Sequence, residues 1–243
     1  MSEQRINVSG IGWVLPASVG AGTEILGRDD WLDPVGPEHD ELENFNVRPY
    51  LQSVKGYLDP AGAYCLAAAS LALGEHHSAD EVRPDAGICT VTQYGAPTSG
   101  FKFFGQLVQK GPRLASPLLF PHSYSNTAGN LAAIEFGFGG PHVVFYAGGE
   151  VQDAFDFALN RLEDGTAAEM IVAAYEAVPP QTVPDGTTVL EGAVCVWLSV
   201  RESAPELLAV KREALTTPLQ SADKDLGSVY RLLTLLQRVG AER

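Results

Sequence analysis

Short apolar runs recur along this chain and predict the strands of a sheet. Residues 85–93, 168–178 and 192–200 are almost continuously apolar or small, which is typical of strands buried on both faces. Apolar and small residues alternate over 5–13 and predict a first strand there. Residues 206–212 are expected to extend the same sheet.

Segments with helical spacing lie between these runs. Asp59 is a good N-cap and Pro60 suits a first helical position, so a helix is predicted from there to Gly74. Residues 14–58, rich in proline, glycine and acids, predict loops and short helices. Further helices are predicted over 101–109, 126–136, 150–162 and 221–239. The alternation predicts an α/β fold, a single domain over residues 1–243 with a mostly parallel central sheet flanked by helices.

The composition is that of a globular protein, with 45% hydrophobic and 19% charged residues among 243. A formal net charge of −14 disfavours nucleic acid, which needs a basic surface, and anionic membranes. No apolar run is long enough to span a bilayer, and the N-terminus lacks the basic start and apolar core of a secretory signal. We therefore expect a cytoplasmic protein that binds neither nucleic acid nor membrane.

Metal, redox and cofactor chemistry find no support in the sequence. Cys65, Cys89 and Cys195 lie far apart in apolar surroundings and form no C-x-x-C pair, so buried thiols are expected. His76 and His77, near a helix end, are expected to complement the helix dipole rather than to bind a metal. No cofactor and no metal site is predicted.

A glycine pair, Gly148-Gly149, stands between the apolar segment 142–147 and an amphipathic helix. Many enzymes hold a nucleophile at such a strand-to-helix corner, but glycine carries none, so covalent catalysis is not expected there. His122 and Ser123 make a poor alternative pair of base and nucleophile. Adjacent residues rarely face each other, and no acid is placed to orient the base.

Taken in order, several segments resemble the N-terminal half of the β-ketoacyl synthases, which have the thiolase fold. The resemblance covers residues 5–212 and rests on an ordered set of pieces that are each weak alone. These pieces are a helix at 59–74 similar to the family's D-x-x-x-x-x-A-x-x-A-A helix, Asn126 and Gly129, the G-x-G-G-P-x-V run at 137–143, Glu176 after a small-residue strand, and E-G-A at 191–193.

Two departures from the family determine the expected function. The family places its cysteine nine positions after the glycine that corresponds to Gly140, and Gly149 stands there in this chain. A cysteine at a helix N-terminus gains nucleophilicity because the dipole lowers its pKa, whereas Glu150 would raise it. Gln152 lies near the position where chain-length factors carry a glutamine, but it is offset by three residues and its role is not transferred.

The second departure is length. A full synthase has a second half that supplies two histidines, and the chain ends soon after the first half. All five histidines precede that region, so none takes over their role: His39, His76, His77, His122 and His142.

The resemblance also implies a partner. In the family, the strand before the nucleophile pairs with its mate across a dimer two-fold, and the corresponding interface residues are Val143, Val144, Phe145 and Tyr146. Alternatively, this strand is simply central to its own sheet. The helix at 126–136 is expected to reach towards the partner's acyl tunnel. Its candidate wall residues are Tyr124, Asn126, Thr127, Asn130 and Phe136.

The sequence therefore predicts a non-catalytic subunit that resembles a chain-length factor. It would pair with a full-length β-ketoacyl synthase and shape its acyl tunnel in fatty acid or polyene-type polyketide biosynthesis. Acyl-carrier protein would dock mainly on that partner, because carrier proteins of this type are acidic and this chain would repel them. Two alternatives stay open: a stand-alone thioester decarboxylase or hydrolase with a backbone oxyanion site, and a scaffold homodimer.

Overall fold

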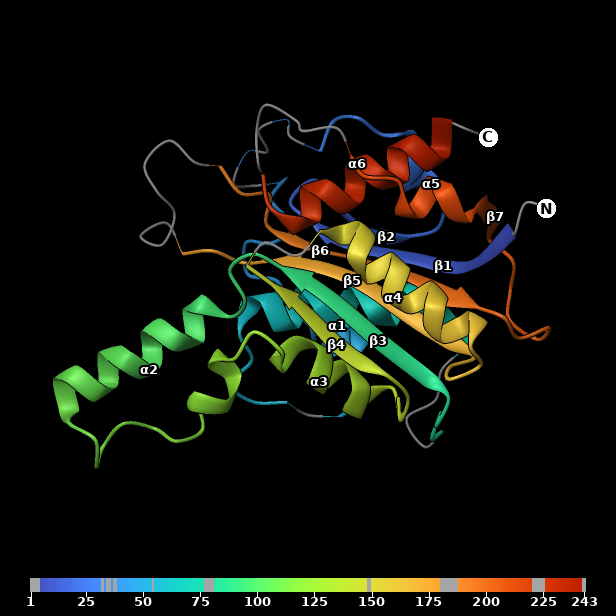
Figure 1. Cartoon of the computed structure of the whole chain (residues 1–243). Helices are drawn as coiled ribbons and strands as arrows, with labels where there is room; N and C mark the ends of the chain where they lie inside the picture. The colour runs from blue at the N-terminus through green and yellow to red at the C-terminus, as the bar shows by residue number, and fades with distance from the viewer. Residues whose placement is uncertain are drawn as a thin grey trace.

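The structure is a computed structural model of the chain. It describes residues 5–31, 33, 36, 39–53, 55–76, 81–147, 150–179, 188–219 and 226–241. A seven-stranded sheet lies at its centre, in the order β2-β1-β6-β5-β3-β4, with β7 paired to β1 off this path (Figure 1). The strands are β1 (Arg5–Leu15), β2 (Ser18–Ala21), β3 (Ala86–Thr92), β4 (His142–Tyr146), β5 (Glu169–Glu176), β6 (Gly192–Ser199) and β7 (Leu208–Lys211).

The sheet is mixed, which corrects the expectation of a mostly parallel one. β3 runs parallel to both β4 and β5, whereas β1 runs antiparallel to β2, β6 and β7, and β5 runs antiparallel to β6. The apolar runs of β5 and β6 mark burial on both faces, and that burial says nothing about strand direction. Among the described residues no helix lies between β5 and β6, so the chain returns antiparallel instead of crossing over.

Helices cover both faces of the sheet. On one face lie α1 (Pro60–Leu73) and α3 (Thr127–Glu135), and on the other lie α4 (Val151–Glu163), α5 (Arg212–Thr216) and α6 (Ser228–Ala241) (Figure 1). Each layer closes its own hydrophobic core, so β5 and β6 are buried along their whole length. Of the predicted tail helix, residues 221–225 lie outside the described residues, and the helix itself begins at Ser228.

The start of α1 follows the sequence prediction. Asp59 caps the helix, its Oδ1 accepting a hydrogen bond from the Ala61 backbone N–H at 3.1 Å, and Pro60 occupies the first position. Asp59 Oδ2 also accepts from the Ser99 backbone N–H at 2.7 Å, which joins α1 to the start of the next helix. Burial raises the pKa of Asp59. One carboxylate therefore fixes two helix starts.

Close packing of α1 on the sheet depends on glycine. A Cβ atom at Gly12 would overlap the backbone carbonyl oxygen of Ala68, and one at Gly10 would overlap that of Ala72. The small-residue surface of α1 and these two glycines of β1 let the helix lie directly against the strand. The segment 14–58 carries short 3-10 helices as expected, and also strand β2, which the sequence did not predict.

Candidate functional site

The corner between β4 and α4 carries acidic side chains on its described side. Gly148 and Gly149 themselves lie outside the described residues. Glu150 is the N-cap of α4, and its side chain accepts from the Asp153 backbone N–H, while Asp153 Oδ2 accepts from the Glu150 N–H at 3.1 Å. Two carboxylates thus occupy the helix N-terminus, where they take up N–H groups that an oxyanion site would use.

Gln152 lies in the first turn of α4 and is only 4% exposed. Within the described part of the chain, neither its side-chain oxygen nor its nitrogen has a hydrogen-bond partner. It is therefore a buried polar group without a hydrogen-bond partner among the described residues, at the start of α4.

β4 lies at the edge of the sheet, which corrects the alternative that it is a central strand. Among the described strands it pairs with β3 alone. Val143, Val144 and Phe145 are half-buried, and Tyr146 is exposed. An apolar strand with a free edge offers its backbone N–H and C=O groups to another strand.

The five candidate wall residues do not share one surface. Tyr124, Asn126 and Asn130 are exposed. Thr127 is buried and its hydroxyl donates to the Pro121 carbonyl at 2.6 Å. Phe136 is 1% exposed in the core between α1 and α3. Its assignment as a tunnel wall stays a prediction, and a substitution there acts first on the core.

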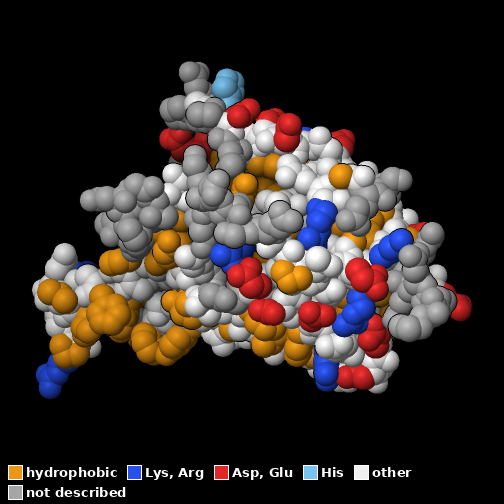
Figure 2. All heavy atoms as spheres, turned by 45° about the horizontal axis from the view of Figure 1, so that its top comes forward, with side chains coloured by type: hydrophobic (Ala, Val, Ile, Leu, Met, Phe, Trp, Pro, Cys, Tyr) orange, Lys and Arg blue, Asp and Glu red, His pale blue; other side chains and the backbone are white. Residues whose placement is uncertain are grey.

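An exposed helix projects from the body beside β4. This helix, α2 (Pro97–Lys110), buries only Ser99 and packs against η5 (Phe120–Ser123) (Figure 1). We call residues 97–124 the arm. Exposed hydrophobic side chains gather on it (Figure 2), namely Phe101, Phe104, Val108, Leu114, Leu118, Phe120 and Tyr124. The sequence predicted this helix but not its exposure.

The arm also differs in charge from the rest of the chain. Between Asp85 and Glu135 the sequence has Lys102, Lys110 and Arg113 but no aspartate or glutamate, although the chain as a whole carries a net charge of −14. The arm is therefore a basic and apolar surface on an acidic protein.

A hollow of about 430 Å³ lies where the arm meets the ends of β3 and β4. We call it the aromatic hollow. Its aromatic lining is Tyr94, Phe101, Phe104, Tyr124 and Tyr146. The volume is within the range of small-ligand pockets, and the lining suits an apolar ligand. Of these residues the sequence singled out Tyr124 and Tyr146 for other reasons, and it missed the hollow because the lining comes from three separate segments, 94–104, 123–125 and Tyr146.

His122 and Ser123 do not form a nucleophilic pair. The Ser123 hydroxyl donates to the Phe120 carbonyl at 2.7 Å, within η5. Burial lowers the pKa of His122. The arrangement is that of a structural turn at the base of the arm.

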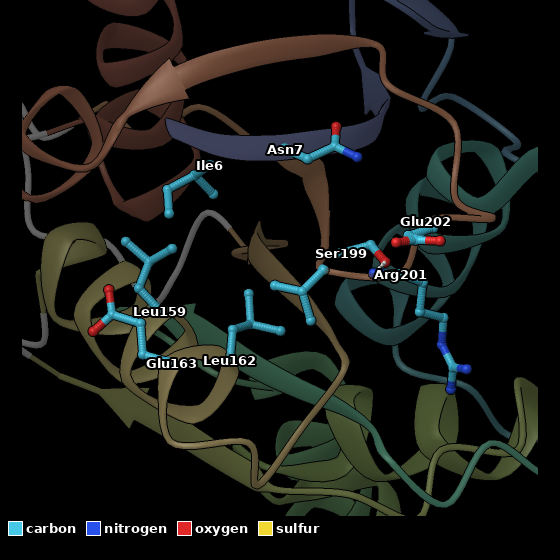
Figure 3. Close-up of a pocket in the computed structure, with 9 residues that line it drawn as sticks. Ile6, Asn7, Leu159, Leu162, Glu163, Ser199, Arg201 and Glu202 are labelled. Atoms are coloured by element: carbon cyan, nitrogen blue, oxygen red, sulfur yellow. Dashed lines mark hydrogen bonds between the residues drawn. The ribbon is translucent and has the colours of Figure 1, made fainter. Parts of the chain in front are cut away.

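A second pocket, of about 300 Å³, opens near the start of β1 and the end of α4 (Figure 3). Ile6, Leu159 and Leu162 form its apolar part. Two of its charged neighbours are engaged elsewhere: Arg201 pairs with Asp85 and Glu169, and Glu163 pairs with Arg212. The Ser199 hydroxyl oxygen in its lining accepts a hydrogen bond from the Arg201 backbone N–H at 3.1 Å, and the pocket lies away from the corner between β4 and α4, so it is the weaker candidate.

The structure supports the expectation of buried thiols. Cys65, Cys89 and Cys195 are all free and buried, and burial raises the pKa of Cys89. Within the described residues, no cluster of His, Cys, Asp or Glu is arranged to hold a metal ion. His76 lies against the Trp197 ring, at 5.8 Å between centroids, and His77 lies outside the described residues. In the same part of the chain, no helix has the length and apolarity needed to cross a membrane.

Comparison with known proteins places the fold. No protein-family model and no curated protein matches this chain. Solved structures do match, among them the ishigamide ketosynthase/chain length factor, with a TM-score of 0.65 and 19% identity over 85% of this chain and 65% of that one. A chain in the structure of a type II polyketide synthase acyl-carrier protein in complex with its ketosynthase bound to the hexaketide matches with a TM-score of 0.61 and 16% identity, over 83% of this chain and 64% of that one.

A third match is a ketosynthase in complex with its chain length factor from Xenorhabdus doucetiae, with a TM-score of 0.56 and 15% identity. It covers 81% of this chain and 79% of that one, so the two chains are of similar length. By contrast, this chain spans only about two thirds of the first two matched chains. Identities this low establish the fold alone: the chain has the thiolase-like α/β fold of the ketosynthases and chain length factors.

Proposed function

We propose that this chain is a non-catalytic subunit with the role of a chain-length factor. It pairs with a full-length β-ketoacyl synthase and shapes the acyl tunnel of that partner in fatty acid or polyketide biosynthesis. The observation that carries the proposal is the free edge of β4, which lies beside an exposed apolar arm and an aromatic hollow.

The arm supports a partner subunit on energetic grounds. A helix of the length of α2 is marginal in water by itself, and most helical stability in proteins comes from packing an apolar face. Here that face is exposed at Phe101, Phe104 and Val108. Exposed apolar patches of this kind mark surfaces that are covered in an assembly. The structural neighbours include a ketosynthase in complex with its chain length factor, and one of the matched chains has a similar length.

The aromatic hollow supports contact with an acyl chain. Tyr146 ends β4, Tyr124 ends the arm, and both line the hollow, so a partner that covers the edge of β4 and the arm would also cover the hollow. The partner would then close an apolar cavity between the two subunits. In this arrangement Phe101 and Phe104 join Tyr124 as candidate wall residues.

The absence of catalysis is part of the proposal and has two supports. Gly149 stands where the family has its cysteine, and the helix that follows begins with a carboxylate capping box. The same capping box weighs against a stand-alone thioester hydrolase with an oxyanion site at this helix. The partner would supply the cysteine and the histidines and dock the acyl-carrier protein.

Product length in a reconstituted pair tests the proposal. The chain is co-expressed with a full-length β-ketoacyl synthase, and Phe104→Ala is compared with Val108→Ala. Both residues are exposed on α2, but only Phe104 lines the hollow. We expect longer products with Phe104→Ala and unchanged products with Val108→Ala. Identical product lengths in both variants and in the wild type would remove the chain-length role.

A further inference from the structure

Glu176, the last residue of β5, is completely buried and joins two segments that are far apart in the chain. Its Oε1 accepts from the Gln93 backbone N–H at 2.7 Å, in the turn after β3. The same oxygen accepts from the Ser228 hydroxyl at 2.6 Å and the Ser228 backbone N–H at 3.3 Å, at the start of α6. Its Oε2 accepts from the Tyr94 backbone N–H at 3.2 Å.

Every partner of this carboxylate is a hydrogen-bond donor. The Thr92 hydroxyl also donates to Oε2, at 3.2 Å, and accepts in turn from the Gly95 backbone N–H at 2.9 Å. No lysine or arginine pairs with Glu176 in the described part of the chain. Ionisation is therefore opposed by burial, which raises the pKa of Glu176, and is supported by its hydrogen bonds and by the N-terminus of α6.

The turn held by Glu176 is a wall of the aromatic hollow. Tyr94 and Gly95 both line the hollow, whereas none of its lining residues belongs to α6. Gly95 has a φ of 73°, and a Cβ atom there would lie 3.2 Å from the Ser125 Cβ and 3.3 Å from the Tyr146 ring. The turn therefore packs tightly against the other two walls of the hollow, at Ser125 and at Tyr146. A small displacement of the turn changes the shape of the hollow.

We propose that Glu176 is a positioning residue that couples the docking of α6 to the shape of the aromatic hollow. When α6 is docked, Ser228 and the turn at 93–94 share the carboxylate. When α6 undocks, the carboxylate loses two donors, and the turn loses the anchor that presses it into the wall. The inference rests on the proposed function insofar as the hollow takes an acyl chain, but the mechanical coupling itself does not require a ligand.

Coupling of this kind is reciprocal. A ligand that needs the turn in its docked position also favours docked α6, although it never touches that helix. Conversely, any contact that loosens α6 weakens binding in the hollow by the same factor. α6 lies in the helix layer on the face of the sheet opposite α1 and α3, so the coupling acts across the end of β5 (Figure 1).

Hydrogen exchange of the free chain, read by mass spectrometry, tests the coupling. Ser228→Ala removes the hydroxyl donor at the start of α6 and leaves residues 93–95 unchanged. Glu176→Gln replaces one accepting carboxylate oxygen by an amide NH₂ group, which then faces the N–H and O–H donors of Gln93, Tyr94 and Ser228. We expect exchange to accelerate about fivefold or more in both α6 and residues 93–96 in either variant. Glu135→Gln is the matched control, because Glu135 is also a buried carboxylate that accepts from backbone N–H groups, at Gln52 and Ser53.

If Ser228→Ala accelerates exchange in α6 alone, the coupling is overturned, even if Glu176→Gln does not fold. A second experiment measures hydrogen exchange with dodecanoate as the ligand probe. Slower exchange in α6 when dodecanoate is bound supports the coupling, and unchanged exchange in α6 despite saturable binding overturns it. If dodecanoate does not bind while the two segments still loosen together, the coupling stands and the acyl-binding role of the hollow falls.

Discussion

Substitutions at two phenylalanines, one exposed and one buried, should distinguish a surface that binds a partner from the hydrophobic core. Phe104 is 63% exposed on the arm, and Phe136 is buried between α1 and α3. Full burial of a phenylalanine side chain is worth about 1.5–3 kcal/mol. If a partner covers the exposed part of the Phe104 side chain, removal of that side chain weakens the complex by about 1–2 kcal/mol, which is about 5- to 25-fold in Kd.

The assay compares Phe104→Ser with Phe136→Ala. Urea unfolding of the free chain is expected to change little for Phe104→Ser, and to lose about 3–5 kcal/mol for Phe136→Ala because a large cavity opens in the core. Titration with the full-length β-ketoacyl synthase is expected to show weaker binding for Phe104→Ser. The reasoning fails if Phe104→Ser destabilises the free chain as much as Phe136→Ala does, or if it binds the synthase as tightly as the wild type.

Three further predictions follow from single side chains. Burial opposes ionisation of Glu135, but hydrogen bonds from Lys55, Ser53 and Gln52 outweigh it and lower its pKa to about 2. The ionised Glu135 carboxylate stabilises the folded chain fully above pH 4.5, the ordinary pKa of the group, and this stabilisation is lost as the pH falls towards 2. Between pH 4.5 and 2, the free energy of unfolding should therefore drop more steeply in the wild type than in Glu135→Gln. Asp59→Ala should lower the unfolding free energy by about 1–3 kcal/mol, because it removes the cap of α1 and the acceptor of the Ser99 N–H; an unchanged urea midpoint would contradict this. Gly149→Cys should give no synthase activity towards malonyl-thioester in the isolated chain, and measurable condensation would refute the non-catalytic proposal.

The positions of the strands were predictable, but their directions and neighbours were not. Continuous apolar runs located β3, β5 and β6, since burial on both faces requires such sequences. The apolar sequence of β4 did not show whether it is an edge strand that pairs with another subunit or a central strand of its own sheet. Both are apolar, and only the pairing observed among the described strands tells them apart.

The hollow and the role of Glu176 were out of reach for a different reason. Local patterns predict elements, but Tyr94, Tyr124 and Tyr146 meet only because three segments fold against one another. Glu176 was singled out by resemblance alone, and its hydrogen bonds to residues 93–94 and 228 depend on the docking of α6. Gly148 and Gly149 lie outside the described residues, so the role proposed for Gly149 rests on the sequence alone.

The most direct test of the central claim is hydrogen exchange of the chain mixed with the full-length β-ketoacyl synthase, after native mass spectrometry has established the stoichiometry. The proposal predicts a one-to-one complex in which residues 142–146 of β4 and residues 97–124 of the arm become protected together. Failure to form a complex, or a complex that protects other surfaces while β4 and the arm exchange as in the free chain, would contradict it.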